Sequence, residues 1–230
     1  MRQVTFGVTA AIVGTVLVLH SGAAPRGGAP QSGATQTIDL AAQLKAGKLR
    51  TVNREVTPSA DKPGAVHLSE KEGNGVAWVE GTDFALGTIE VDIKGRDLMQ
   101  RSFVGIAFHR KEDNAYDCVY LRPFNFRSTD PVRKPHAVQY VALPDYDWPR
   151  LRKEFPEEFE NPVDQSIEPT GWVPVKIVVK EKAIDIFVGN VKAPALEVRR
   201  LGANDRGTVG VWAGNGSDGD YANLRITPAK

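Results

Sequence analysis

The residues best suited to chemistry lie within residues 102–125, a stretch that reads as two strands joined by a charged turn. Alternate side chains of a strand share a face, which in the second strand groups Tyr116, Cys118, Tyr120 and Arg122. The same alternation in the first strand separates Val104, Ile106 and Phe108 from Gly105, Ala107 and His109. Small side chains on one strand beside large polar ones on the next leave a shallow polar groove. This groove is the leading candidate for a binding site.

The side chains around this groove are of the types that hold a sugar. A sugar site places an aromatic ring against the apolar face of a pyranose and polar groups against its hydroxyls, because an unpaired buried hydroxyl costs ~1–3 kcal/mol. The candidate binding residues are Tyr120, Arg122, Asn125, Gln139, Asp147 and Trp148. Gln139 and Tyr140 point to opposite faces of one strand, and we expect Gln139 to face the groove. Core packing is the alternative role for the aromatics, and pairing with Asp117 or Glu154 is the alternative for Arg122.

Other reactive side chains carry weaker signals. Cys118 is the only cysteine, so no intrachain disulfide can form, and we expect it to be a small buried residue rather than a nucleophile. His109, His136 and Asp117 form a candidate acid–base or metal group, but their spacing matches no metal-ligand template. Surface or hairpin roles are therefore expected for the histidines. No nucleotide or redox-cofactor motif is visible.

The elements that must position these residues are short strands separated by turn residues. Residues 173–179 alternate, with β-branched side chains on one face. The other predicted strands span residues 38–40, 49–56, 65–68, 75–79, 88–93, 102–109, 116–122, 136–142, 183–188, 196–198, 208–213 and 221–226. Without a long helical period, this pattern predicts an all-β fold, an antiparallel sandwich or jelly roll.

Residues 143–162 interrupt the strand pattern with aromatic, acidic and arginine side chains. Within them, residues 148–155 predict one or two helical turns, with Asp147 as the N-cap. An insertion of this length usually lies across one end or face of a sheet. Because it follows the predicted strand 136–142 directly, we expect this short helical insertion to form a wall of the groove.

The first 36 residues read as targeting and linker sequence. Arg2, the apolar run 4–19 and the small residues at 21–23 predict a secretory signal peptide over residues 1–24, with an uncleaved membrane anchor as the alternative. Residues 25–36 predict a disordered linker, and residues 37–228 the folded domain. We therefore expect a secreted or periplasmic protein that makes no membrane contact after cleavage.

The charge balance argues against two classes of partner. The formal net charge is +1, with 25% charged residues, and no run of like charges occurs. Phosphate binding needs a concentrated basic patch, so a nucleic-acid partner is not expected. A polybasic membrane motif is absent as well. No pattern in the sequence indicates an oligomeric state.

Several motifs together resemble the concanavalin A-like lectin/glucanase superfamily. They are GTIEVDIKG, FVGIAFH followed by YDCVYLRPFN, HAVQY, WVPVKIVV and GTVGVWAGNGSDGDYANLRI. Within that superfamily the chain is most similar to laminin-G-like domains and to bacterial secreted domains labelled 3-keto-disaccharide hydrolases. The shared closing features are Gly207, Gly210, Asp218-Gly219 and residues 221–224. The resemblance implies a concanavalin A-like jelly roll over residues 37–228, and leaves function open because this sandwich hosts lectins, hydrolases and adhesion modules.

The resemblance directs attention to the acidic pair Glu90 and Asp92. Retaining glycosidases on this fold carry three alternate carboxylates on one strand, and two of them, ~5–5.5 Å apart, act as nucleophile and general acid. Glu90 and Asp92 share a face, but Lys94 occupies the third position. We therefore expect a solvent-facing side of a strand here rather than that catalytic site.

A second acidic motif lies near the C-terminus. Asn215, Asp218 and Asp220 resemble an oxygen-ligand loop for Ca²⁺, which the resemblance makes a candidate structural ion. These residues do not follow the EF-hand order, and a metal-free Gly/Asn/Asp turn is the alternative. No other cofactor is expected.

Three functions fit these observations. The first is a secreted carbohydrate-binding jelly roll that recognises a glycan on its concave face. The second is a glycoside hydrolase of the 3-keto-disaccharide type, with Asp117 or Asp147 as acid/base and with Arg122 and Gln139 positioning the sugar. The third is a laminin-G-like structural or adhesion domain that binds protein. Paired pocket carboxylates favour the enzyme, an open aromatic platform the lectin, and a flat apolar patch protein recognition.

Overall fold

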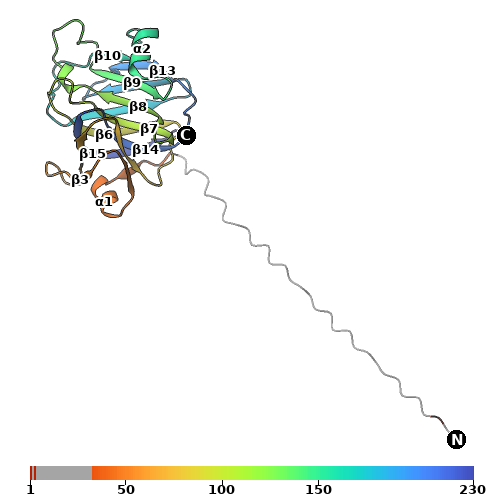
Figure 1. The fold of residues 1–230 in the computed structure, drawn as a ribbon. Helices are drawn as coiled ribbons and strands as arrows, with labels where there is room; N and C mark the ends of the chain where they lie inside the picture. The colour runs from red at the N-terminus through yellow and green to blue at the C-terminus, as the bar shows by residue number, and fades with distance from the viewer. Residues whose placement is uncertain (2, 4–32) are drawn as a thin grey trace. The chain divides into compact units, whose positions relative to one another are not determined.

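The computed structural model describes residues 1, 3 and 33–230, and the strands within 33–230 form two antiparallel sheets (Figure 1). Sheet A contains β1 (Gln36–Ile38), β3 (Val56–Pro58), β4 (Val66–Lys71), β6 (Gly87–Lys94), β11 (Val173–Val179), β12 (Ala183–Val188), β13 (Leu196–Arg199) and β15 (Ser217–Pro228). Sheet B contains β2 (Leu49–Val52), β5 (Gly75–Val79), β7 (Val104–Glu112), β8 (Ala115–Leu121), β9 (Val138–Leu143), β10 (Glu160–Asn161) and β14 (Thr208–Ala213). The helical elements are α1 (Leu40–Lys45), the 3-10 turn η1 (Pro123–Asn125) and α2 (Trp148–Glu154).

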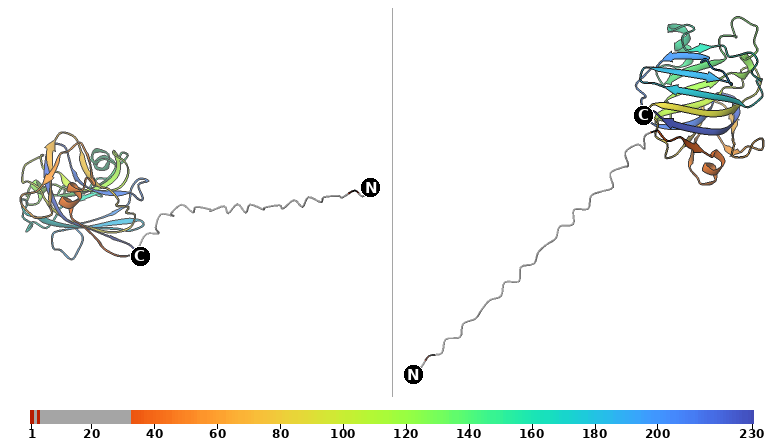
Figure 2. Two further views of the ribbon diagram at one scale, coloured as in Figure 1. Left: turned by 90° about the horizontal axis from the view of Figure 1, so that it is seen from below. Right: turned by 180° about the vertical axis from the view of Figure 1, so that it is seen from behind.

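Strands distant in the sequence are neighbours in both sheets, as a jelly roll requires. Sheet A has the order β13-β12-β11-β6-β15-β4-β3, with β1 beside β15. Sheet B has the order β10-β9-β8-β7-β14-β5-β2. The view from behind in Figure 2 shows the long dark-blue β15 beside the yellow β6 in sheet A. The fold is the all-β antiparallel sandwich, with a short helical insertion, that the sequence predicts.

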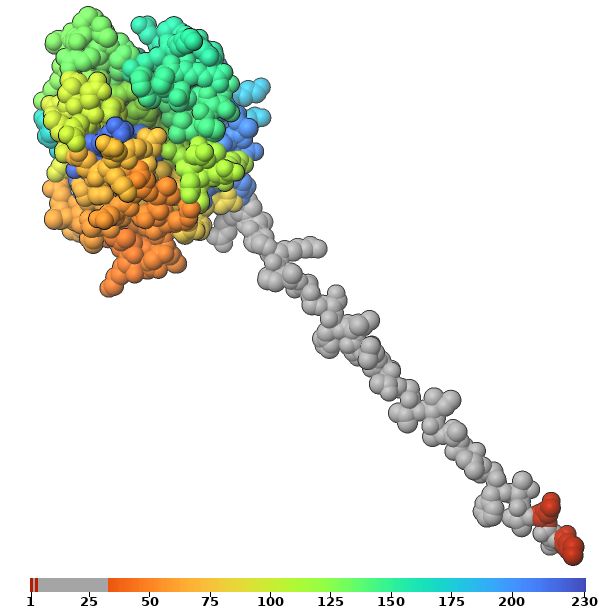
Figure 3. Space-filling model, viewed as in Figure 1, coloured from red at the N-terminus to blue at the C-terminus, as the bar shows by residue number. Residues whose placement is uncertain are grey.

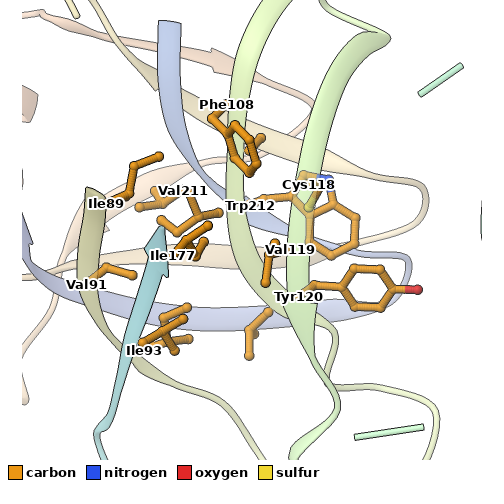
Figure 4. Close-up of a cluster of buried hydrophobic side chains, with 14 of the residues drawn as sticks. Ile89, Val91, Ile93, Phe108, Cys118, Val119, Tyr120, Ile177, Val211 and Trp212 are labelled. Atoms are coloured by element: carbon orange, nitrogen blue, oxygen red, sulfur yellow. The ribbon is translucent and has the colours of Figure 1, made fainter. Parts of the chain in front are cut away.

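The core lies between the sheets, and the period-two pattern of the strands creates it. In β11 every second residue is buried, and these residues pair with the buried side of β6. The paired positions are Val173↔Ile93, Val175↔Val91 and Ile177↔Ile89. Sheet B adds Ile106, and Figure 4 shows Val119 and Val211 from the same sheet. Each such aliphatic side chain contributes about 1.5–3 kcal/mol when fully removed from water.

Most predicted strands are observed, and residues 75–79, 173–179, 183–188 and 208–213 match their predicted bounds. The predicted strand 49–56 is wrong, because β2 ends at Val52 and Val56 already begins β3, which belongs to the other sheet. Asn53, with φ of 51°, adopts a left-handed conformation between them. Asn tolerates this region better than most residues. The sequence also missed α1, which Asp39 caps by accepting a hydrogen bond from the Ala42 amide at 2.8 Å.

The predicted signal peptide, residues 1–24, and most of the predicted linker lie outside the described residues. The linker prediction ends one residue too late, because Gln36 already pairs with Ile226 of β15. Within the described part of the chain, no helix is both long enough and apolar enough to cross a membrane.

Candidate functional site

A groove of about 850 Å³ lies over the outer face of sheet B, the face turned away from the core. Its base comes from β2, β5, β8, β9 and β14, and its walls come from the loops 95–103 and 126–137 and from α2. Figure 3 views the molecule from this side, with the teal segment that contains α2 standing beside green and yellow segments. Three apolar side chains exposed on the walls are Met99, Val132 and Trp148.

Two large aromatic rings form part of the base. Tyr120 of β8 and Trp212 of β14 lie with ring centroids 5.1 Å apart. Figure 4 shows both side chains on the side of sheet B away from Ile89, Val91 and Ile93. Gly105 of β7 pairs with both residues, and a Cβ there would lie 2.2 Å from the carbonyl oxygen of Val119. A glycine at this position therefore allows the strands and rings to approach.

Arg122, Tyr120 and Gln139 form one hydrogen-bonded unit beneath the groove. The Tyr120 hydroxyl donates to Gln139 Oε1 at 2.6 Å and accepts from Arg122 Nη2 at 2.9 Å. Arg122 Nη2 also donates to Gln139 Oε1. Burial raises the pKa of Tyr120 to about 12, so its hydroxyl keeps its proton at neutral pH.

Gln139 pairs with Tyr120 across β8 and β9 and therefore points to the groove side of sheet B, whereas Tyr140 points into the core. However, Gln139 is fully buried and does not line the groove. It therefore orients Tyr120 and Arg122 from below rather than presenting its own amide.

Asn125 of η1 lines the groove and is almost fully buried. Its Nδ2 donates to the carbonyl oxygen of His136 at 2.9 Å. Its Oδ1 has no hydrogen-bond partner among the described residues. Buried polar atoms are nearly always paired, so an unpaired acceptor directly beneath a groove stands out among the residues of this site.

The insertion forms a wall of the groove, and α2 begins at the predicted place. Asp147 caps the helix by accepting a hydrogen bond from the Arg150 amide at 3.1 Å. Trp148 follows on the rim with 49% of its surface exposed. The Arg152 guanidinium stacks on one side of its indole, 5.0 Å from the ring centroid. Asp147 and Trp148 thus both line the groove, with the Asp147 carboxylate occupied as a cap.

Sequence reasoning missed the acidic centre of this region, Glu160. Its carboxylate receives Arg152 at 2.8 and 2.9 Å and lies 2.8 Å from His136 Nδ1 and 3.5 Å from Arg122 Nη1. Arg122 therefore pairs with Glu160, and the alternative partners considered for it, Asp117 and Glu154, were wrong. Burial lowers the pKa of His136, and Arg152 and Arg122 act in the same direction against the opposing charge of Glu160.

Asp117 does not line the groove. It pairs with Phe108 and points into the core, where Asp117 and His109 are both 0% exposed. Its Oδ2 lies 2.9 Å from His109 Nδ1, and His109 Nε2 lies 2.7 Å from the carbonyl oxygen of Ala85. Strict alternation predicted the opposite face for His109, but a β-bulge after Phe108 and a φ of 56° turn it inward.

The candidate group of His109, His136 and Asp117 is therefore divided. His109 and Asp117 lie between the sheets, whereas His136 lines the groove beside Glu160. Among the described residues, no set of three or more His, Cys, Asp or Glu side chains is placed to hold a metal ion. Cys118 is a free, buried thiol whose pKa burial raises, in line with the predicted packing role.

The calcium candidates are engaged by protein groups. Asn215 Oδ1 accepts from the Gly73 amide at 2.7 Å. Asp218 lies 2.6 Å from Arg96 Nε, and Asp220 lies 3.2 Å from His67 Nδ1. The three residues thus serve a turn and an ion-pair network rather than converging on one point.

Glu90 and Asp92 occupy the solvent side of β6, as expected, while Ile89, Val91 and Ile93 are buried. Asp92 pairs with Lys62 at 2.7 Å and accepts from Asn223 at 2.6 Å. They lie in sheet A, away from the residues that line the groove over sheet B.

Solved structures place this architecture in a class. The chain is similar to a carbohydrate-binding module, CBM66, of Bacillus subtilis (11% identity, 77% of this chain and 94% of that chain, TM-score 0.56). It is also similar to a Bacillus subtilis protein of unknown function with a galectin-like fold (13%, 87% and 99%, TM-score 0.54). A third is the lumenal domain of VIP36 with Ca²⁺ and Man3GlcNAc bound (11%, 80% and 85%, TM-score 0.53). No protein-family model and no curated protein matches the chain.

These similarities define the fold as the concanavalin A-like jelly roll that the sequence motifs resemble. At such identities the likeness extends to the fold alone. Function must therefore be argued from the groove itself.

Proposed function

We propose that this chain is a carbohydrate-binding module that holds a saccharide in the groove over sheet B. The observation that carries the proposal is the convergence, in one groove, of aromatic rings with a buried acceptor, Asn125 Oδ1, that has no partner among the described residues. Aromatic rings match the apolar face of a pyranose, and amide and guanidinium groups match its hydroxyls.

The arrangement supports pre-organisation of the site. Glu160 lies beside Nη1 of Arg122, and Gln139 and Tyr120 both accept from its Nη2, so little side-chain freedom is lost when a ligand binds. Trp148 stands on the rim with half of its surface accessible, which suits stacking against a sugar ring. The glycan-binding neighbours support the same proposal: one is a carbohydrate-binding module and another holds Man3GlcNAc. We also propose a secreted or periplasmic location, which is what the signal peptide predicted over residues 1–24 implies.

The hydrolase alternative has weaker support from the geometry. Asp117 has no access to the groove, and the Asp147 carboxylate is the helix cap. The laminin-G-like alternative, protein recognition, is not favoured by the groove, because the groove mixes apolar and polar side chains. Both remain outcomes of the experiment below.

A glycan array probed with the full chain tests the proposal, with Trp148→Ala as the diagnostic variant. Trp148 is exposed, so the variant should fold, and loss of one stacking ring should weaken affinity for a hit about two- to tenfold. Trp172→Ala is the matched control, because Trp172 lies just before β11 in sheet A and does not line the groove.

Titration calorimetry on the hits measures the change, and mass analysis of the incubated glycan reports turnover. Equal binding by the wild type and Trp148→Ala would move the site away from the groove. Turnover of the glycan would replace the binding module with a hydrolase, and absence of any glycan hit would overturn the proposal.

A further inference from the structure

The cluster around Glu160 carries more positive charge than its single carboxylate neutralises. Glu160 is 3% exposed, and the guanidinium groups of both Arg122 and Arg152 lie within 3.5 Å of its oxygens. With His136 neutral, two positive charges share one negative charge, which leaves a formal surplus of one. A partly buried surplus charge is poorly screened by water and attracts an ion of opposite sign.

The surplus is accompanied by donors that remain free. Arg152 uses Nε and Nη2 on Glu160, and its Nη1 makes no hydrogen bond to any described residue. His136 directs Nδ1 toward Glu160, and its Nε2 is likewise without a partner in residues 33–230. The Arg152 and His136 side chains are 33% and 21% exposed, and both line the groove.

The other charged groups of the groove are engaged elsewhere and do not pair with Arg152 or His136. The two carboxylates among the lining residues are already engaged, Asp113 by Arg50 and Arg110 and Asp147 as the cap of α2. Arg133 adds a further guanidinium to the lining, paired through Nε with Asp130. Asp147 keeps its negative charge as a cap, but Arg152 and His136 have Glu160, not Asp147, as their acidic partner.

We propose that the groove takes an acidic saccharide, and that the carboxylate or sulfate group of this saccharide binds Arg152 and His136 beside Arg122. This inference rests on the proposed carbohydrate-binding function and names the class of sugar. Charge-assisted hydrogen bonds from guanidinium to carboxylate or sulfate are about twice as strong as neutral ones, so the anionic group dominates selection. Aromatic and amide groups elsewhere in the groove then hold the sugar rings.

Matched glycans test the inference on the full chain. Oligogalacturonides, their neutral methyl esters, sulfated galactan oligosaccharides and unsulfated galactan oligosaccharides belong on the same array as the wider glycan set. We expect the hits to be acidic glycans, with the neutral counterpart at least about tenfold weaker. Preference for the uronate pair or for the sulfate pair distinguishes the two anionic groups. Hits confined to neutral glycans would overturn the inference and leave the proposed function intact.

Arg152→Gln is the diagnostic variant, and Arg150→Gln on the same helix is its control. Arg150 pairs with Glu154 and stacks on Tyr146, and it does not line the groove. Arg152→Gln should lose about tenfold in affinity for an acidic hit, whereas Arg150→Gln should match the wild type. Equal affinity of both variants for the acidic hit would show that the anionic group of the glycan does not bind at the cluster around Glu160. Thermal unfolding of both variants checks that the fold is retained.

Inorganic sulfate provides a readout that depends on no sugar. In an NMR titration of the full chain, sulfate should shift the ring resonances of His136 and the Arg152 side-chain resonances, with Arg150 as the internal reference. A sulfate shift without any glycan hit would sink the carbohydrate proposal and retain the anion site. Glycan binding without a sulfate shift would overturn the anion site and retain the carbohydrate proposal.

Discussion

Two histidines in residues 33–230 lie at almost the same distance from a buried carboxylate but in different surroundings. Asp117 lies 2.9 Å from His109 Nδ1, and Glu160 lies 2.8 Å from His136 Nδ1. The first pair lies between the sheets with no exposed surface. The second pair lies at the groove, where His136 keeps an accessible face.

The difference lies in which polar atoms remain free. Around Asp117, His109 uses both ring nitrogens, and Asn204 approaches the second carboxylate oxygen at 3.4 Å. Around Glu160, Arg152 and His136 each retain a nitrogen without a partner in the described residues. A satisfied and sealed pair stabilises the fold, whereas a pair with surplus donors and access is equipped to bind.

Removing the sealed carboxylate should have the largest effect on stability. Asp117→Ala removes the partner of His109 Nδ1 and one of the two acceptors of Asn204 Nδ2 in the core, and we expect about 3–5 kcal/mol less free energy of unfolding. Glycan affinity of the folded fraction should not change. Guanidinium unfolding followed by fluorescence gives the first quantity, and calorimetry gives the second.

The exposed pair Lys111–Asp205 supplies the control for this experiment. Asp205 is 72% exposed at its side chain, so Asp205→Ala should leave stability close to that of the wild type. If Asp117→Ala instead abolished glycan binding while unfolding like the wild type, Asp117 would belong to the site, and the contrast between the two pairs would fail.

A methyl group between the strands of sheet B should damage the site and the sheet together. A Cβ on Gly105 would press on the Val119 carbonyl and on Tyr120, so we expect Gly105→Ala to cost about 1–3 kcal/mol in stability. It should also weaken glycan binding by displacing the Tyr120 ring. Gly171→Ala, with its nearest atom 3.5 Å away, is the matched control. Similar stability of the two variants would show that the close approach at Gly105 is not required.

The fold was predictable because its signal is repeated along the chain. The alternation in each strand predicts the buried face of that strand independently, so the wrong prediction at 49–56 does not affect the prediction for residues 173–179. The motif at residues 207–224 adds a local resemblance that the solved structures support. Because many strands carry the same alternating pattern, a sandwich can be predicted from sequence even where the ends of single strands are missed.

Part of the candidate site could be predicted from the same alternation. Period-two alternation places Tyr120 and Arg122 on one face, and the Asp147 cap signal predicts where α2 begins. Trp212 also follows the alternation and was available to the same reasoning, since it shares a face with Gly210 in residues 208–213. What alternation does not provide is the distance between strands remote in the sequence.

The acidic centre illustrates what could not be predicted. Glu160 is one of four glutamates in residues 154–160, and only the pairing of the two-residue strand β10 with β9 places it beside Gln139. A strand this short has no period to detect. His109 escaped prediction for a related reason, because a single bulge reverses its face while leaving the sequence pattern unchanged.

The pH dependence of anion binding sharpens the comparison further. Burial lowers the pKa of His136 in the free protein, and a bound anion beside the ring should raise it. Affinity for an acidic glycan should therefore rise as pH falls through the ordinary histidine range and level off once His136 is protonated in both states. His136→Gln should flatten this profile. His109→Gln offers no useful control, since the sealed pair should affect stability only.

Titration calorimetry between pH 5 and 8, about the range in which histidine titrates, measures this profile. The charged groups that face His136 are Glu160 from β10, Arg152 from α2 and Arg122 just after β8. A profile that stays the same in His136→Gln would assign the pH dependence to the glycan rather than to the protein.

The smallest effect on stability is expected at Asp113, which like Glu160 is paired with two arginines. Asp113 also receives two arginines, Arg50 at 2.6 Å and Arg110 at 3.0 Å, and the Arg50 hydrogen bond lowers the pKa of Asp113 to about 2. Its side chain is 42% exposed, however, so water screens the attraction. We expect Asp113→Asn to lower stability at neutral pH by less than about 1 kcal/mol.

Two measurements separate a screened ion pair from a buried one at Asp113. Because its pKa is depressed, the contribution of Asp113 is present above the ordinary aspartate range and is lost as pH falls through about 2. At neutral pH, added salt should remove most of the difference in stability between the wild type and Asp113→Asn. The corresponding difference for Glu160→Gln, at 3% exposure, should persist in salt. A large, salt-resistant loss in Asp113→Asn would show that the number of partners, and not burial, decides what a carboxylate contributes in this fold.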